Sequence, residues 1–321
     1  MKKETFQTID QIIAWLLEGD VSIQFQVHRD LLKSDRNILE DFQKRISKEG
    51  FGAKFLLKQN KNGHWGTSYY FPKWISTHYT LLDLKNLNIH PENEKIKKAV
   101  KLILKNEIGE DGGINPSVTI PFSDVCVTGM FLNYAAYFKT PEENLNPIID
   151  YLLEQKMNDG GFNCSKHHLG AKKSSLHSTL SVAEGIREYV LNRYEYRLDE
   201  LLEAEKTSIE FMLKHHLYLS CSTGEIIRKQ FLRLSYPSRW FFDILRALDY
   251  LRTAEQPFDK RMSESFQVLI KKRKKNGLWP LQAHPSGQRH FDMEKVGSPS
   301  RWNTLRALRV FSHFKVSLNP E

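Results

Sequence analysis

The chain has 321 residues, of which 47 are basic and 38 acidic, so its formal net charge is +9. No apolar run reaches the length of a membrane span, and the charged start of the chain lacks the uninterrupted apolar stretch of a secretory signal. Three cysteines, an odd number in a chain with no export signal, favour reduced thiols or metal thiolates over disulfides, and we expect a cytoplasmic protein.

The basic excess is spread along the chain and is also gathered in a run of five cations at residues 271–275. A solvated helix end is the simplest interpretation of that run. No DNA- or RNA-binding motif accompanies it, so we expect no nucleic-acid partner. The same excess would suit an anionic small molecule such as a diphosphate.

The N-terminal segment predicts two helices. Thr8-Ile9-Asp10-Gln11 is typical of a capping box and precedes the apolar residues 12–17, and a further helix is expected over residues 22–32. This pair either closes a ring of repeats or covers one edge of it.

A short turn motif then recurs about every fifty residues, each time after an aliphatic run that predicts the end of a helix. Its four clear copies are Asn62-Gly63-His64-Trp65, Asp111-Gly112-Gly113-Ile114, Asp159-Gly160-Gly161-Phe162 and Asn276-Gly277-Leu278-Trp279, and a weaker copy is Thr223-Gly224-Glu225-Ile226. Glycine allows a positive φ and Asn or Asp bonds its own backbone, so the chain can reverse there. The recurrence predicts an array of helical hairpins.

The residue that closes each turn is expected to pack between neighbouring hairpins. Trp65, Phe162 and Trp279 are large apolar side chains at this place, and packing is their simplest role.

The second helix of each hairpin is expected to begin near residues 72–76, 124–128, 175–179, 237–240 and 299–302. Small residues such as Gly129 and Gly185 are concentrated on these helices, which permits close approach and predicts an inner ring within a bulkier outer one. We therefore expect an all-α fold, an α/α toroid of about five hairpins plus the N-terminal pair. It would be one domain spanning residues 1–321, with residues 1–40 as a helical cap and 41–315 as the repeats.

Hairpins of this length with Gln/Asn-x-x-(Asn/Asp)-Gly-x-Trp/Phe turns resemble the α/α toroid of terpenoid cyclases and protein prenyltransferase β subunits, with squalene cyclase-like repeats. The resemblance covers about residues 40 to 314. The turn motif is moderately specific for the fold and says little about chemistry.

The resemblance extends to a zinc site. One inner helix begins Asp124-Val125-Cys126 and the next carries His177 near its start, which is similar to the zinc site of prenyltransferase β subunits. The run from His177 to Gly185 also resembles the His-centred helix of that family. The resemblance implies that Asp124, Cys126 and His177 are zinc ligands.

Cys164 adds a further possible ligand, because it lies two residues after the third turn in a loop that leads towards His177. Zinc takes thiolate, imidazole and carboxylate ligands, and a catalytic site keeps one position open. The sequence thus permits a site of Cys126, Cys164 and His177, with Asp124 completing it or supporting a ligand. The alternative is that the cysteines are small buried apolar residues and that His177 bonds to the backbone. Two thiolates and an imidazole are also similar to the zinc site of lanthionine cyclases, although their Cys-His pair is not found.

A second candidate feature is a cation followed by tryptophan at three inner-helix starts. The pairs are Lys73-Trp74, Arg239-Trp240 and Arg301-Trp302, and Tyr69 and Tyr70 precede the first of them. Helix N-termini and arginine both favour anions, so these residues predict an anion-binding opening lined by aromatic rings. The alternative is a helix start with a serine cap and a tryptophan in the core.

Several motifs are missing. Neither Asp-x-Asp-Asp nor Asp-Asp-x-x-Asp occurs, and residues 115–122 lack the basic side chains that prenyltransferases place before Asp-x-Cys. We expect a central cavity that holds zinc and binds an apolar, prenyl-like small molecule with an anionic end. The protein would then be a transferase or a cyclase. The sequence assigns neither its catalytic residues nor a partner subunit. The alternatives are a carbohydrate-active toroid with paired carboxylates such as Asp243 and Glu184, and a non-catalytic binding or scaffold protein.

Overall fold

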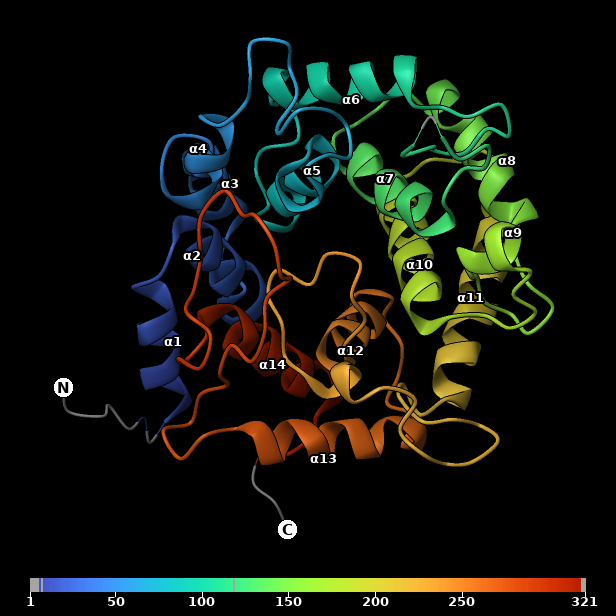
Figure 1. The fold of residues 1–321 in the computed structure, drawn as a ribbon. Helices are drawn as coiled ribbons and strands as arrows, with labels where there is room; N and C mark the ends of the chain where they lie inside the picture. The colour runs from blue at the N-terminus through green and yellow to red at the C-terminus, as the bar shows by residue number, and fades with distance from the viewer. Residues whose placement is uncertain (1–5, 7, 118, 319–321) are drawn as a thin grey trace.

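The computed structural model describes residues 6, 8–117 and 119–318, and over these residues the regular structure is helical. Two concentric rings of helices surround a common axis (Figure 1). The inner ring consists of α2 (Val21–Val27), α5 (Thr77–Asn86), α7 (Val125–Tyr137), α10 (Leu176–Leu191), α12 (Ile244–Thr253) and α14 (Arg301–Phe314). The outer helices are α1 (Ile9–Leu17), α3 (Arg36–Ile46), α4 (Gly50–Leu56), α6 (Glu94–Asn106), α8 (Asn146–Glu154), α11 (Leu198–Lys214) and α13 (Ser263–Lys272). The predicted all-α toroid is confirmed.

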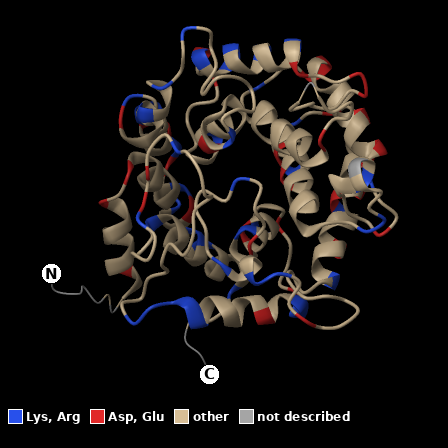
Figure 2. Cartoon of the chain, viewed as in Figure 1, with Lys and Arg blue, Asp and Glu red and all other residues tan. Residues whose placement is uncertain are grey.

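Short helical segments occupy some of the connections. They are the π-helical turn η1 (His28–Leu32), the 3-10 turns η2 (Lys73–Ile75), η3 (Glu142–Asn144), η4 (Lys229–Leu232) and η5 (Lys260–Met262), and the short helix α9 (Ser165–Leu169). None of the helices formed by the described residues is long and apolar enough to span a bilayer. Basic and acidic residues alternate over helices and loops all round the ring (Figure 2).

The recurring turns have the backbone that their glycines predict. Gly63, Gly112, Gly160 and Gly277 all have positive φ, between 83° and 95°. In each turn the glycine N–H donates to the carbonyl three residues earlier, as from Gly63 to Asn60 at 3.0 Å. The sharp reversal between an outer and an inner helix therefore depends on a conformation that glycine adopts without a steric cost.

The residue after each turn is anchored to the following inner helix by one repeated contact. Its backbone N–H donates to a buried threonine hydroxyl in the first turn of that helix, at 2.9 to 3.1 Å. The four pairs are Trp65 with Thr77, Ile114 with Thr128, Phe162 with Thr179, and Trp279 with Thr304. The side chains of Trp65, Phe162 and Trp279 are fully buried, which confirms their packing role.

Two inner helices, α7 and α10, approach each other unusually closely. A Cβ atom on Gly185 would lie 2.4 Å from the carbonyl oxygen of Gly129, and one on Gly129 would lie 2.7 Å from Cα of Val182. Only glycine fits at both positions, as the small residues of these helices predicted. This contact holds the N-terminal half of α7 against the middle of α10.

The N-terminal helices complete the inner ring. The expected capping box is present, since Thr8 and Gln11 exchange backbone and side-chain hydrogen bonds. Helix α2 packs against α14, and its Gln26 donates from Nε2 to the carbonyl of Asn86 on α5 at 2.9 Å. Arg309 of α14 adds a buried ionic link, because it contacts Asp249 of α12 and Asp30 of η1. The N-terminal segment thus lies between the last and the first inner helices of the repeats.

Two predicted helix starts differ from the structure. Residues 237–240 form a loop in which Arg239 has φ of 54°, and α12 begins only at Ile244 behind its cap Asp243. Likewise Lys73 and Trp74 belong to η2, and α5 begins at Thr77. Of the three pairs of a cation and a tryptophan, only Arg301-Trp302 begins an inner helix as expected, with Ser300 as its cap.

Candidate functional site

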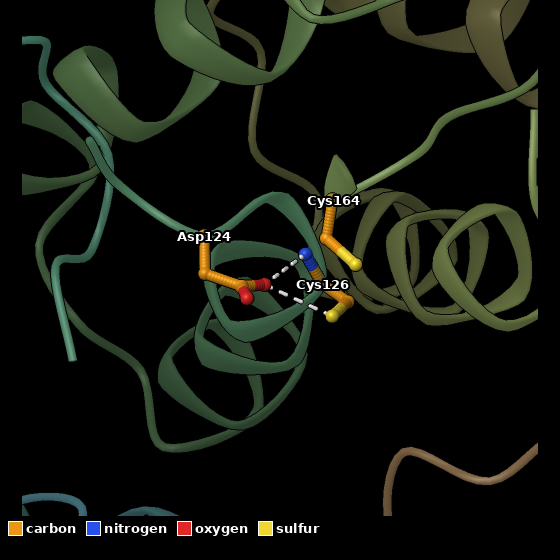
Figure 3. Close-up of side chains that lie close together, drawn as sticks. All are labelled: Asp124, Cys126 and Cys164. Carbon is orange, nitrogen blue, oxygen red and sulfur yellow. Dashed lines mark hydrogen bonds between the residues drawn. The ribbon is translucent and has the colours of Figure 1, made fainter. Parts of the chain in front are cut away.

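Two thiols and a carboxylate meet where α7 begins. Asp124, Cys126 and Cys164 each offer one ligand atom, and these atoms lie within 4.8 Å of one another. Figure 3 shows Asp124 and Cys126 on the start of α7, with Cys164 reaching them from a neighbouring segment. Among the described residues, one group of three or more His, Cys, Asp and Glu side chains could hold a metal ion, and it is this one. We call it the Asp-Cys-Cys cluster.

Local structure explains how α7 presents its part of the cluster. Asp124 is the N-cap of α7, and its Oδ1 accepts from the backbone N–H groups of Cys126 at 2.9 Å and Val127 at 3.0 Å. The same oxygen accepts from the Cys126 Sγ–H at 2.9 Å. A helix cap therefore fixes the carboxylate and directs it to the thiol two residues onward.

The loop that carries Cys164 is held against α10. The Cys164 N–H donates to Ser178 Oγ at 3.1 Å, and two residues earlier Phe162 is anchored to Thr179. Because α10 is in close contact with α7 through glycine, these bonds bring Cys164 to Cys126. The cluster is thus assembled from segments about forty residues apart in the chain.

The two thiols have opposite pKa shifts. The hydrogen bond with Cys164, together with burial and the charge of Asp124, raises the pKa of Cys126 well above its usual value. The same hydrogen bond lowers the pKa of Cys164 to about 7, against the opposing effect of burial. Of the two thiols, Cys164 therefore loses its proton more readily.

Lys73 is a cation close to the cluster. The Nζ of Lys73 lies over the rings of Trp74 at 5.0 Å, Trp240 at 5.3 Å and Tyr70 at 5.8 Å. Burial lowers the pKa of Lys73, and the negative charges of the Asp-Cys-Cys cluster oppose this shift. Lys73, Tyr70, Trp74 and Trp240 thus form an aromatic cage with a cation beside the cluster.

His177 does not join the cluster. Its Nδ1 accepts the backbone N–H of Phe242 at 2.8 Å, and its ring packs on Phe231 and Trp240 at centroid distances of 5.1 and 4.9 Å. Burial lowers its pKa to about 4. Although His177 begins α10 as expected, the structure gives its imidazole the backbone-bonding role that the sequence analysis kept as the alternative.

The other two predicted cations lie elsewhere. Arg239 is buried, donates from Nη2 to Asp83 at 3.1 Å and stacks on Trp74 and Tyr79. Arg301 donates to the carbonyl of Trp15 at 3.0 Å and lies over its ring at the outer helix α1. The three predicted cations therefore do not surround one opening. Arg239 and Arg301 are each bound to a different neighbour, Asp83 and Trp15.

The remaining predicted aromatic residues are buried. Tyr69 shares a hydrogen bond of 2.8 Å with Nδ1 of His78. Trp302 stacks on Tyr236 with ring centroids 4.5 Å apart and planes at 12°. Neither residue contributes to the cage around Lys73.

The carboxylates proposed for a carbohydrate-active site share one arginine. Arg246 donates from Nη2 to Glu184 at 2.6 Å, and its backbone N–H donates to Asp243 at 2.9 Å. Asp243 is buried, and burial raises its pKa. Both acids are therefore bound to Arg246 instead of facing each other across free space.

A cavity of about 530 Å³ lies inside the inner ring, and most of its lining is polar or charged. Four of its charged residues, Arg246, Asp249, Arg306 and Arg309, were not predicted from the sequence, whereas Arg239 and Glu184 were named among the candidate site residues. The signal was present, because these charges interrupt the apolar faces of α12 and α14 at helical spacing.

Neither a protein-family model nor a curated protein sequence matches the chain. Among solved structures, a family 88 glycosyl hydrolase from Bacteroides vulgatus is similar, with a TM-score of 0.52 and 12% identity over 98% of this chain and 100% of that one. A protein from Actinoplanes gives a TM-score of 0.47 and 13% identity over 93% and 91% of the two chains. A type II terpene cyclase from Scytonema, in complex with geranylgeranyl dihydroxybenzoate, gives 0.42 and 13% over 95% of each. At these identities the likeness concerns the fold alone, and the chain is an α/α toroid whose chemistry has to be derived from its own residues.

Proposed function

We propose that this toroid is a zinc-dependent enzyme, in which Asp124, Cys126 and Cys164 hold the ion beside the Lys73 cage. The observation that carries the proposal is the convergence of two thiols and one carboxylate within 4.8 Å. A chance meeting is disfavoured by the devices that maintain it, which are a helix cap, a loop bonded to α10 and a glycine contact between two helices.

The donor set suits zinc. Zinc binds thiolate sulfur and carboxylate oxygen, and three protein ligands leave a fourth position open, as in catalytic sites. A bound zinc ion would supply Lewis acidity or lower the pKa of a substrate thiol. The two thiols would bind as thiolates, so binding would release the proton that Cys126 now donates to Asp124.

The Lys73 cage accounts for substrate binding in this proposal. Its rings offer apolar surface, and its ammonium group can neutralise an anionic end or a leaving group. We therefore propose a prenyl-like substrate, apolar with one anionic end, and a transfer or cyclisation reaction at the cluster.

Metal analysis of the purified protein tests the proposal. We expect about one equivalent of zinc, lost in Cys126→Ala and Cys164→Ala. Cys221→Ala is the matched control, because Cys221 is exposed and lies outside the cluster. Zinc that is absent from the wild type, or retained by both cluster variants, would refute the site.

The thermal stability of the same variants separates catalysis from structure. A Cys126→Ala protein that loses zinc and stays folded supports a catalytic ion, whereas one that unfolds indicates a structural ion in a scaffold protein. Binding of farnesyl diphosphate, followed by tryptophan fluorescence, is expected to weaken about tenfold in Lys73→Met, since one charge-assisted contact is lost. Hydrolysis of a glycoside that is insensitive to zinc and lost in Glu184→Gln would instead favour the carbohydrate-active alternative.

A further inference from the structure

The cavity inside the inner ring is separate from the Asp-Cys-Cys cluster. Its lining follows the inner helices towards their C-terminal ends, whereas the cluster lies at the N-terminal ends of α7 and α10. Along α14, for example, the lining runs from buried Trp302 in the first turn to exposed His313 in the last. Leu191 and Glu255 are likewise exposed at the ends of α10 and α12. The cavity therefore opens at the C-terminal ends of the inner helices.

The floor of the cavity is formed by residues that solvent hardly reaches. Arg239, Arg246, Arg306 and Trp302 all line it, and each is at most 6% exposed. The loop that contains Arg239 closes this end, and Arg239 stacks there on Trp74 of the Lys73 cage. Arg239 thus lies between the cavity, which it lines, and the Lys73 cage, whose Trp74 it contacts.

Four buried polar atoms of this lining have no hydrogen-bond partner. They are Nε and Nη1 of Arg239, Nε1 of Trp302 and Oδ1 of Asn133. Buried polar groups are nearly always hydrogen-bonded, so four unpaired atoms on residues that line one cavity point to a missing partner. Three of the four are donors, and the fourth is an acceptor.

The lining carries more basic than acidic side chains. The cavity is lined by eight basic side chains, Arg29, Lys85, Arg187, Arg239, Arg246, Arg252, Arg306 and Arg309, and five acidic ones, Asp30, Glu184, Glu188, Asp249 and Glu255. Two further carboxylates, Glu205 and Asp83, pair with Arg187 and Arg239 from behind the lining. Most of these cations have close carboxylate partners, but Arg306 is held only by contacts of 3.4 to 3.7 Å. Arg239 and Arg306 therefore keep donors for a ligand at the floor.

We infer that this cavity binds a hydroxylated organic anion, a small molecule with a phosphate or carboxylate group and several hydroxyl groups. The oxyanion accepts from Arg239, Arg306 and Trp302 Nε1, and a hydroxyl donates to Asn133 Oδ1. The volume is within the range of small-molecule sites, and a lining rich in charge suits a polar ligand better than a prenyl chain. The site does not depend on the metal cluster.

Titration calorimetry of the full chain tests this inference with glucose 6-phosphate, gluconate, inorganic phosphate and glucose. We expect glucose 6-phosphate or gluconate to bind at one site, and glucose at least about tenfold more weakly because it lacks the oxyanion. Tighter glucose 6-phosphate indicates a phosphate ligand, and tighter gluconate indicates a carboxylate. Protein treated with a chelator is expected to bind equally well, which separates this site from the zinc proposal.

Conservative variants identify the floor as the site. Trp302→Phe keeps the stacked ring and removes the Nε1 donor, so affinity is expected to fall about tenfold, and Asn133→Asp is expected to weaken binding at least as much through repulsion. Trp15→Phe on α1 is the matched control and is expected to leave affinity unchanged, with circular dichroism confirming the fold of each variant. The inference is overturned if neither anion shows saturable binding up to about 10 mM, because water alone would then fill the cavity. It is also overturned if Trp302→Phe binds the anion as tightly as the wild type does.

Discussion

Removing Asp249 is expected to weaken the buried ionic link between the inner helices α12 and α14. Asp249 accepts from Arg309 Nε at 2.8 Å and Arg252 Nε at 2.9 Å, and its carboxylate lies 3.7 Å from Arg306. Burial alone would raise the pKa of Asp249, but the charges of Arg309 and Arg252 hold it well below its usual range. The side chains of Asp249 and Arg309 are only 13% and 10% exposed, so bulk solvent screens this ion pair weakly.

Asp249→Ala therefore leaves several buried guanidinium groups with less compensating charge. Breaking a buried ion pair by removing one partner costs about 3–5 kcal/mol. Arg309 retains Asp30 at 2.7 Å, so we expect a value near the lower end, about 3 kcal/mol in the free energy of unfolding by urea. The double variant Asp249→Ala with Arg309→Met is expected to lose less than the sum of the two single changes.

Asp150→Ala is the matched control for this prediction. Asp150 also pairs with an arginine, Arg197 at 2.6 Å, but both side chains are about a third exposed or more, at 42% and 32%. Exposed pairs contribute about 0–1 kcal/mol, so this variant is expected to stay close to the wild type. A loss below about 1 kcal/mol for Asp249→Ala, or equal losses for the two variants, would contradict the stabilising role of this buried link between α12 and α14.

Two further predictions concern the inner helices. Burial lowers the pKa of His78 to about 3, so below its unfolded pKa of 6.5 the unfolded chain takes up a proton that the folded chain does not, and stability is lost as the pH falls. Between pH 7 and 5 this proton uptake lowers the free energy of unfolding by about 2 kcal/mol, measured with urea. His78→Gln is expected to lack this loss. If the free energy of unfolding falls with pH equally in the variant and the wild type, the prediction for His78 is wrong. Thr179→Val leaves the Phe162 N–H without its 3.0 Å acceptor, so we expect a loss of about 1–3 kcal/mol and weaker zinc affinity, measured by urea unfolding and competition with a chelator. Unchanged zinc affinity in a folded Thr179→Val protein would show that this anchor does not position the Asp-Cys-Cys cluster.

The sequence predicted the repeats well because their signals are local. A glycine that needs positive φ and a large apolar residue behind it depend only on the turn, and both occur as expected at the four clear copies. The threonine that anchors each turn was missed. Its distance from the turn varies, from Trp65 to Thr77 and from Trp279 to Thr304, so no fixed period reveals it.

The Pro-Ser-Arg-Trp motif shows why local sequence was insufficient for the site. At residues 299–302 the serine caps a helix, and Glu294 accepts the N–H groups of its first turn. At residues 237–240 the same four residues form a loop, because Arg239 is held by Asp83 from another inner helix. An ion pair distant in sequence decided the conformation, and with it the location of the predicted anion site.

The Asp-Cys-Cys cluster was predicted in part. Asp124 and Cys126 follow from the start of α7, and Cys164 was named from its place after the third turn. His177 was expected beside them, but its Nδ1 is bonded to the backbone of Phe242. The direction of an imidazole at a helix start depends on the packing around it, which the local pattern does not contain.

X-ray absorption at the zinc edge, on the wild-type protein loaded with one equivalent of zinc, tests the central claim most directly. We predict two sulfur neighbours at about 2.3 Å and two oxygen or nitrogen neighbours at about 2.0–2.2 Å. A spectrum without sulfur neighbours, or protein that does not retain the ion, would contradict the assignment of Asp124, Cys126 and Cys164 as a zinc site.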